Sequence, residues 1–310
     1  MNVSFRPVEF ESQGATLRGR LYLPKDSLKK KYAIVIMAHG FTSTINHMTA
    51  DKYAERFCGA GFAVLLYDHR NLGISDGQPR QEINFWVQAR GYLDAIDFVY
   101  TLSETDTSKI SVWGASLSAR EAFLAGSIDD RINSIILLIP AFGDSFPTGD
   151  KDGSLYEFAR GIIQSGDIMA IPHSKTEQMP VVSHDQIGHP SRLKELTAYR
   201  WFIEYGGRFG SHWQNAVSFA THNVPENFHI GQCTPHIKAP TLMIVAKNDE
   251  MEGAKPEVTK QIFNMLNQPG EWVDISGGHF GLLYYPGSIF EKASKAQIEF
   301  LQKHHNQHGA

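Results

Sequence analysis

Runs of consecutive apolar residues, each about as long as a strand, recur along this chain. The first spans residues 32–38 (Tyr-Ala-Ile-Val-Ile-Met-Ala), and a shorter, more polar one spans residues 271–275. The other runs lie between these two, at residues 62–67, 110–113, 134–139 and 241–246. Strands that are buried on both faces of a parallel sheet have this pattern, because neither face meets water. The runs therefore predict a mostly parallel central sheet.

Apolar residues with helical spacing fill most of the intervals between these runs. The predicted helices cover residues 50–59, 84–102, 117–125, 256–266 and 288–304. Alternation of strands and helices requires crossover connections, which place helices on both faces of a parallel sheet. Before the first run, residues 3–11 and 16–23 read as two strands around the turn Gln13-Gly14, which predicts an antiparallel hairpin. We expect an α/β fold.

The segment 145–237 interrupts this alternation. It contains no strand-like run, and helical stretches at residues 154–163 and 190–204 alternate with loops rich in Pro, His and Gly. About ninety residues are too many for an ordinary loop. We expect residues 145–237 to form a helical cap inserted into a core made of residues 1–144 and 238–310.

Aromatic residues are dense in the second half of this expected cap. Because ligand pockets are lined mostly by apolar and aromatic side chains, Trp201, Tyr205 and Trp213 are candidate substrate-binding residues. Their chemistry favours a substrate with an apolar acyl or ring portion.

Composition excludes several classes of protein. The chain has 310 residues, 42% of them hydrophobic and 20% charged, with a net charge of −4 and scattered basic residues, so no nucleic-acid partner is expected. Two isolated cysteines, Cys58 and Cys233, make neither a disulfide framework nor a zinc signature. No apolar run approaches the ~18 residues that a membrane span needs, and the amino terminus lacks the apolar core of a signal peptide. We expect a cytoplasmic protein, whose oligomeric state stays open, with a homodimer as one alternative.

A candidate nucleophile lies between the predicted strand that ends near Trp113 and the helix that follows it. The intervening residues are Gly114-Ala115-Ser116-Leu117-Ser118. In a nucleophile elbow, Gly-x-Ser-x-Gly, a sharp turn between strand and helix lifts the serine hydroxyl above the sheet, and small residues flank it because the turn is crowded. Gly114 fits this pattern. Ser118 replaces the second glycine and is small enough to be accepted there.

A serine hydroxyl needs a base, and the base needs an acid to orient it. Chain order selects His279, which follows the last predicted strand in Gly277-Gly278-His279. The acid is expected after the preceding strand, where Asp249 is the candidate and Glu250 the alternative. For the developing oxyanion, we expect the backbone N–H groups of Leu117 and Phe41 to be the donors.

Together these residues resemble the α/β-hydrolase superfamily. The motifs that carry the resemblance are His39-Gly40-Phe41, the 68–77 loop (Asp-His-Arg-Asn-Leu-Gly-Ile-Ser-Asp-Gly), Gly114-x-Ser116, Asp249 and Gly278-His279. The loop and the long cap look most like the branch near dienelactone hydrolases and X-prolyl dipeptidyl-peptidase-like esterases and thioesterases. The resemblance implies a sheet of about eight strands, a Ser–acid–His triad and no cofactor or metal.

The resulting hypothesis is a serine hydrolase that cleaves a carboxylic ester or thioester of a small-molecule acyl substrate through an acyl-enzyme on Ser116. An acyltransferase or a peptidase would use the same triad. A peptidase would need an anchor for a free amino terminus, and the candidates are acids in or next to the cap: Asp144, Asp150, Asp152 and Glu157. A protein that keeps the fold and binds a ligand without catalysis is a further alternative, because fold alone does not establish function.

Overall fold

The computed structural model describes residues 4–25, 31–46 and 49–305. Its centre is an eight-stranded sheet in the order β1-β2-β4-β3-β6-β7-β10-β11. The strands are β1 (Phe5–Ser12), β2 (Ala15–Tyr22), β3 (Tyr32–Ala38), β4 (Ala63–Tyr67), β6 (Thr105–Ala115), β7 (Ile132–Leu138), β10 (Thr241–Ala246) and β11 (Gly270–Ile275). The pairs β1–β2 and β2–β4 are antiparallel, and every other neighbouring pair is parallel. This confirms the predicted fold class.

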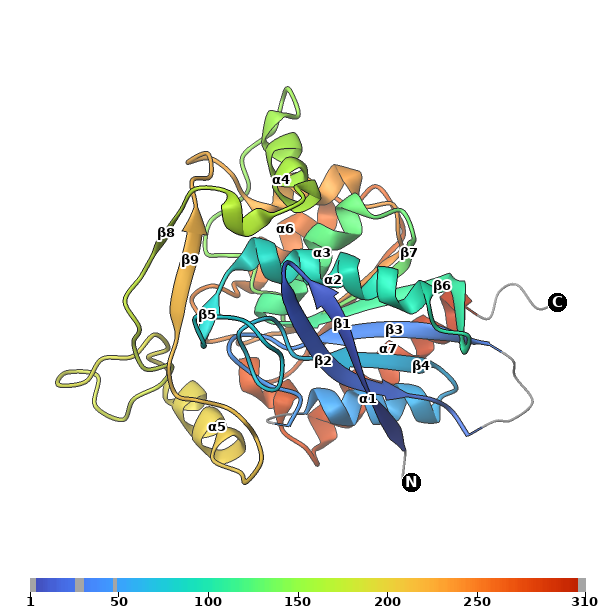
Figure 1. Cartoon of the computed structure of the whole chain (residues 1–310), viewed down its shortest axis with the longest axis horizontal. Helices are drawn as coiled ribbons and strands as arrows, with labels where there is room; N and C mark the ends of the chain where they lie inside the picture. Colours follow the sequence, from blue (N-terminus) through green and yellow to red (C-terminus); the bar gives the residue numbers. More distant parts are fainter. Residues whose placement is uncertain (1–3, 26–30, 47–48, 306–310) are drawn as a thin grey trace.

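Helices cover both faces of this sheet (Figure 1). One apolar cluster joins a face of the sheet to α2 (Phe85–Tyr100), α3 (Leu117–Ile128) and α6 (Pro256–Asn264). The second cluster joins the opposite face to α1 (Ala50–Gly59) and α7 (Ser288–His305). Successive residues of a strand point to opposite faces, so that in β3 Ile36 belongs to the first cluster and Met37 to the second.

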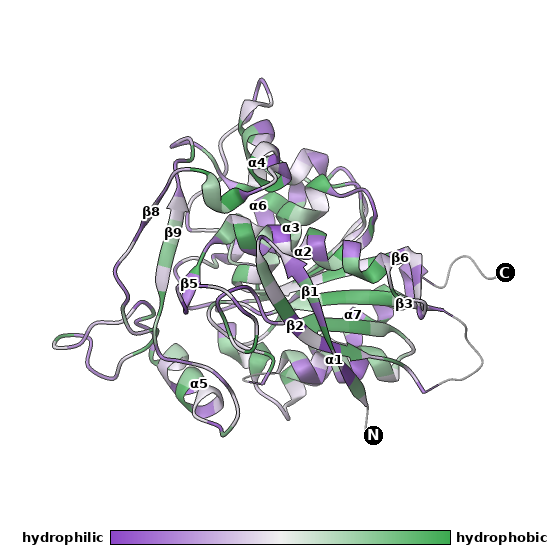
Figure 2. Ribbon diagram, in the orientation of Figure 1, coloured by the Kyte–Doolittle hydropathy of each residue, from purple (hydrophilic) through white to green (hydrophobic). Residues whose placement is uncertain are grey.

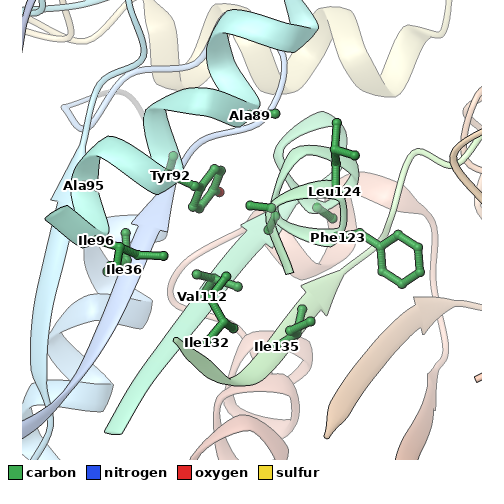
Figure 3. Packing of buried hydrophobic residues seen from close by; sticks show 14 of the residues in the cluster. Ile36, Ala89, Tyr92, Ala95, Ile96, Val112, Phe123, Leu124, Ile132 and Ile135 are labelled. Atoms are coloured by element: carbon green, nitrogen blue, oxygen red, sulfur yellow. The ribbon is translucent and has the colours of Figure 1, made fainter. Parts of the chain in front are cut away.

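Figure 3 shows the first cluster at close range, where Tyr92 of α2 and Val112 of β6 lie between helix and sheet. The central strands are coloured as apolar in Figure 2, whereas the outer surfaces of the helices carry the hydrophilic residues. Continuous apolar runs in the sequence therefore correspond to strands buried on both sides. Among the described residues, no helix combines the length and the apolar character that crossing a membrane requires.

The segment between β7 and β10 contains more than helices. It holds α4 (Ser154–Gln164), η1 (Ile168–Ala170), β8 (His173–Lys175), α5 (Leu196–Gly206), β9 (Ser218–His222) and η2 (Ile230–His236). Strand β9 pairs with β8 and with β5 (Glu82–Ile83), and β5 precedes α2 in the core. Figure 1 shows β8, β9 and α5 along one side of the sheet.

The segment thus contains helices near the two expected positions together with two short strands that were not expected. Strand β8 has three residues, none of them buried, and β9 has five, so neither produces an apolar run that a sequence pattern can reveal. The helix expected at 190–204 begins only at Leu196, because the backbone N–H of Leu193 instead bonds to the carbonyl of Val181.

Helix α7 ends on a buried histidine that contacts the sheet. His305 is 4% exposed, and its Nε2 lies 2.6 Å from Oγ of Ser111 in β6, which in turn lies 2.7 Å from Oγ of Ser134 in β7. Burial lowers the pKa of His305 from 6.5 to about 4. The folded protein therefore needs this imidazole neutral, whereas the unfolded chain takes up a proton as the pH falls below about 6.5.

We expect His305 to make stability dependent on pH. Its contribution is complete above pH 6.5 and is lost as the pH falls towards 4, by roughly 2–3 kcal/mol of unfolding free energy. In His305→Gln, the decrease in unfolding free energy between pH 7 and pH 4.5, measured with urea, should be smaller by about that amount. The exposed His189→Gln is the control, and equal decreases in all three proteins would contradict the prediction.

Candidate active site

Ser116 lies at the junction of β6 and α3 in a strained backbone conformation, with φ +57° and ψ −116°. Its N–H donates to the carbonyl of Leu138 at 2.9 Å, and its carbonyl accepts from the N–H of Ala141 at 3.0 Å. A Cβ on Gly114 would lie 2.2 Å from the carbonyl oxygen of Ser118, so no larger residue fits there. This is the geometry of a nucleophile elbow, held at both ends by the neighbouring strand β7 and the loop after it.

Ser118, which stands where the elbow pattern has a second glycine, is fully buried and forms hydrogen bonds. Its Oγ accepts from the N–H of Ala115 at 3.0 Å and donates to the carbonyl of Ala38 at 2.9 Å. The side chain therefore joins the elbow to the end of β3. The departure from the pattern adds a contact that glycine would lack.

The structure brings Ser116, His279 and Asp249 together. Nε2 of His279 lies 3.0 Å from Oγ of Ser116, and Nδ1 lies 2.7 Å from Oδ2 of Asp249. The histidine follows β11 at the start of η3 (His279–Leu283), and the aspartate follows the adjacent strand β10. Both side chains are almost completely buried. With the proton on Nδ1 held by the carboxylate, Nε2 can accept the proton of the serine hydroxyl.

Glu250, the alternative acid, has a different position. Its Oε2 accepts a hydrogen bond from the backbone N–H of His279 at 2.7 Å, and its Oε1 accepts one from the hydroxyl of Thr197 at 2.6 Å. Glu250 therefore holds the backbone of His279 and connects it to α5. The imidazole itself is oriented by Asp249, whose other oxygen accepts from the N–H of Met251 at 3.0 Å.

The two expected oxyanion donors, Phe41 and Leu117, both border the pocket that contains Ser116. Neither backbone N–H has an internal hydrogen-bond acceptor within the part of the chain that the structure describes. A Cβ on Gly40 would lie 2.7 Å from the carbonyl oxygen of Ala115, so glycine allows the loop after β3 to approach the elbow. Both donors therefore belong to residues that line the same pocket as Ser116.

The pocket at Ser116 has a volume of about 510 Å³. Its apolar lining residues come from the core, from the loop after β10 and from the 145–237 segment: Phe41, Leu117, Leu193, Trp201, Phe202, Phe219, Met251, Phe280 and Leu283. Phe219 stacks on Phe41 with ring centroids 6.0 Å apart, and the guanidinium of Arg192 lies 5.1 Å from the Phe219 centroid. Sequence reasoning did not identify Phe219 or Met251, because nothing in their local pattern distinguishes them from core residues.

Of the three aromatic residues expected to contact the substrate, only Trp201 borders this pocket. The structure does not bring Tyr205 and Trp213 to it: the Tyr205 hydroxyl donates to the carbonyl of Tyr285, and Trp213 stacks on Phe202. Aromatic density in this segment therefore reflects packing of α5 against the core as well as pocket formation.

The 68–77 loop is organised by a buried carboxylate. Asp68 accepts hydrogen bonds from the backbone N–H groups of Ile45 at 2.7 Å and Ile74 at 2.9 Å. Burial raises the pKa of Asp68 to about 6, although these hydrogen bonds oppose the shift. Asp68 thus joins the loop after β3 to the loop after β4. Across the described residues, no three His, Cys, Asp or Glu side chains converge as a metal site would require.

The chain is similar to known proteins over most of its length. A family model described as serine aminopeptidase, S33, matches residues 29–273. The quorum-quenching protein AidA of Acinetobacter baumannii (strain MDR-ZJ06) is 25% identical over 303 residues, covering 97% of this chain and 96% of that protein. The thiohydrolase apmlB of Arthrinium phaeospermum is 29% identical over 320 residues, covering 96% of each.

The solved structures include the α/β hydrolase GrgF from Penicillium sp. sh18, with a TM-score of 0.72 and 23% identity. The match covers 97% of this chain and 99% of that one. At this level of identity the likeness shows the fold.

We expect Ser118→Ala to reduce the free energy of unfolding by about 1–3 kcal/mol, because the N–H of Ala115 and the carbonyl of Ala38 each lose a buried partner. Urea unfolding measures this, and the exposed Ser145→Ala is the control. Equal stability of the Ser118 variant and the wild type would show that the hydrogen bonds do not hold the elbow.

We expect Glu250→Gln to slow labelling of Ser116 by a fluorophosphonate about tenfold, because an amide offers one acceptor where the carboxylate offers two. His279 would then be held less firmly against the serine. The exposed Glu257→Gln on α6 should label at the wild-type rate. An unchanged rate in Glu250→Gln would mean that Asp249 alone is enough to position the histidine.

Proposed function

Because this chain belongs to the serine aminopeptidase S33 family of α/β hydrolases, we propose that it is a serine hydrolase that cleaves a carboxylic ester or thioester of a small molecule. The observation that carries the proposal is the continuous chain of short contacts from Asp249 through His279 to Ser116. The same constellation supports nucleophilic acyl transfer on unrelated folds.

The reaction takes place in two steps at Ser116. His279 removes the hydroxyl proton through Nε2, and Oγ attacks the carbonyl carbon, while Asp249 stabilises the imidazolium that forms. The N–H groups of Phe41 and Leu117 hold the oxyanion. His279 then gives its proton to the leaving oxygen or sulfur. Water, deprotonated by the same histidine, then attacks the acyl carbon. The bond from this carbon to Oγ of Ser116 breaks, the histidine returns its proton to Oγ, and the acid leaves.

The pocket and the relatives favour particular substrates. The apolar lining, including Trp201 and Phe219, suits an acyl or ring portion of low polarity. The name of the relative apmlB, a thiohydrolase, supports a thioester as the bond that is cleaved. Segment 145–237 supplies Trp201, Phe202 and Phe219 to the pocket, so we propose that it acts as a cap that determines substrate choice.

A peptidase that holds a free amino terminus is the second candidate. Three acids, Asp144, Glu195 and Glu252, line the same pocket and could pair with an ammonium group. Hydrolysis of aminoacyl nitroanilides, with the N-acetylated compounds as controls, separates this activity from ester hydrolysis.

Acyl transfer to an alcohol instead of water is a further alternative, and it is detected by adding the alcohol and measuring the new ester.

We expect Ser116→Ala to lower the hydrolysis of aryl esters and matched thioesters of graded chain length at least about a thousandfold, because it removes the nucleophile. Ser145→Ala, a substitution on an exposed loop, should keep wild-type rates. The preferred acyl length and leaving atom then define the substrate class. If Ser116→Ala still hydrolyses the esters, another group is the nucleophile. If a fluorophosphonate does not label the wild type, the protein binds its ligand without catalysis.

A further inference from the structure

Arg120 is a charged residue in the active-site pocket that the hydrolysis of a neutral ester does not require. It belongs to α3 and follows Ser116 by four residues, so it lies on the same side of the helix about 6 Å further along the axis. It is partly buried, and its side chain lines the pocket. A cation therefore stands one helical turn from the serine that we propose as the nucleophile.

The guanidinium of Arg120 has no acidic partner among the residues that the structure describes. Its buried Nε has no hydrogen-bond partner, and in the described part of the chain no carboxylate forms an ion pair with the group. One side of the group lies on the ring of Phe85, 4.6 Å from the centroid. The neighbouring Glu121 points elsewhere, with Oε2 3.0 Å from Nε2 of His69.

This environment is unfavourable for a positive charge. Burial lowers the pKa of Arg120 from its ordinary value, and Glu121 offsets only part of that effect. An arginine remains charged nonetheless, so the folded protein carries an incompletely compensated cation at its active site. An anionic group on a ligand would supply the missing hydrogen-bond acceptors and the missing charge at once.

The acids of the pocket do not fill this role. Asp144 and Glu252 are exposed, and Glu195 accepts a hydrogen bond from the backbone N–H of Lys194 at 3.1 Å. The charge of Arg120 is therefore open to a bound molecule.

We propose that Arg120 binds a carboxylate of the substrate and thereby selects acyl compounds that carry a negative charge about one helical turn from the bond that is cleaved. This inference rests on the proposed hydrolase function and specifies its substrate class. The carboxylate can belong to the acyl chain or to the leaving group, since both portions of an ester lie near Ser116.

Matched pairs of esters test the proposal. For the acyl side, the pair is mono-para-nitrophenyl adipate and para-nitrophenyl hexanoate, which differ by a terminal carboxylate in place of a methyl group. For the leaving-group side, the pair is meta-(hexanoyloxy)benzoate and phenyl hexanoate. Within each pair, the ratio of kcat/KM values is compared between wild type and Arg120→Met, so that differences in intrinsic reactivity cancel.

We expect the wild type to prefer the charged member of one pair and the preference to fall about 10- to 100-fold in Arg120→Met, because the charged hydrogen bonds are lost. Arg120→Lys should retain part of the preference, since it keeps the charge without the planar fork of donors. Arg160→Met, on the exposed face of α4, is the control and should keep the wild-type ratios. The pair that responds identifies the portion of the substrate that carries the carboxylate.

A binding measurement separates this inference from the proposed function. Adipate should raise the Tm of Ser116→Ala more than hexanoate does, and adding Arg120→Met should abolish the difference. If no ester is hydrolysed but this difference is seen, the hydrolase proposal fails and the anion site stands. If the esters are hydrolysed without a preference that depends on Arg120, and adipate does not bind through it, the anion site is overturned while the hydrolase proposal stands.

Discussion

The strained backbone conformation of Ser116, which has a positive φ, is the constraint on which the rest of the site depends. Such a conformation in a residue other than glycine costs of the order of 1–3 kcal/mol, so neighbouring contacts have to maintain it. Here β7 holds the N–H of Ser116 through the carbonyl of Leu138, and Ala141 holds its carbonyl. The packing of Gly114 against α3 and the hydrogen bonds of Ser118 complete the support. Tight packing behind Ser116 thus maintains its strained backbone conformation.

The other two members of the site depend on the order of strands in the sheet. Because β7, β10 and β11 are parallel neighbours, their carboxyl ends lie together, and the loops that follow them can meet above one edge. Asp249 and His279 reach Ser116 from the loops after β10 and β11. Glu250 connects this site to α5: its carboxylate accepts one hydrogen bond from the backbone N–H of His279 and another from the hydroxyl of Thr197. The inserted segment is therefore physically connected to the histidine loop.

Helix α3 carries two adjacent charged residues with opposite surroundings. Glu121 lies behind the elbow, fully buried in the packed interior between helix and sheet, with Oε2 3.0 Å from Nε2 of His69. Arg120 lies on the pocket side with the ring of Phe85 as its neighbour, and no carboxylate of the described residues forms an ion pair with it. A partly buried charge that lacks an ion-pair partner costs stability unless a ligand supplies one. Because Glu121 lies in the interior and Arg120 lines the pocket, we expect only Arg120 to contact a ligand.

By itself, the sequence determined the features that depend on local pattern and chain order. The apolar runs at Tyr32–Ala38 and Thr241–Ala246 coincide with β3 and β10, because strands buried on both faces must be continuously apolar. Chain order likewise selected His279 from fourteen histidines. Only the tertiary structure decided which side chains share the pocket, because that depends on how segments distant in the sequence pack together. It placed Arg120 and Phe219 in the pocket, and it packed Tyr205 and Trp213 against the core instead. It also decided the pairing of β8 with β9, because these strands are too short for their sequences to carry a periodic signal.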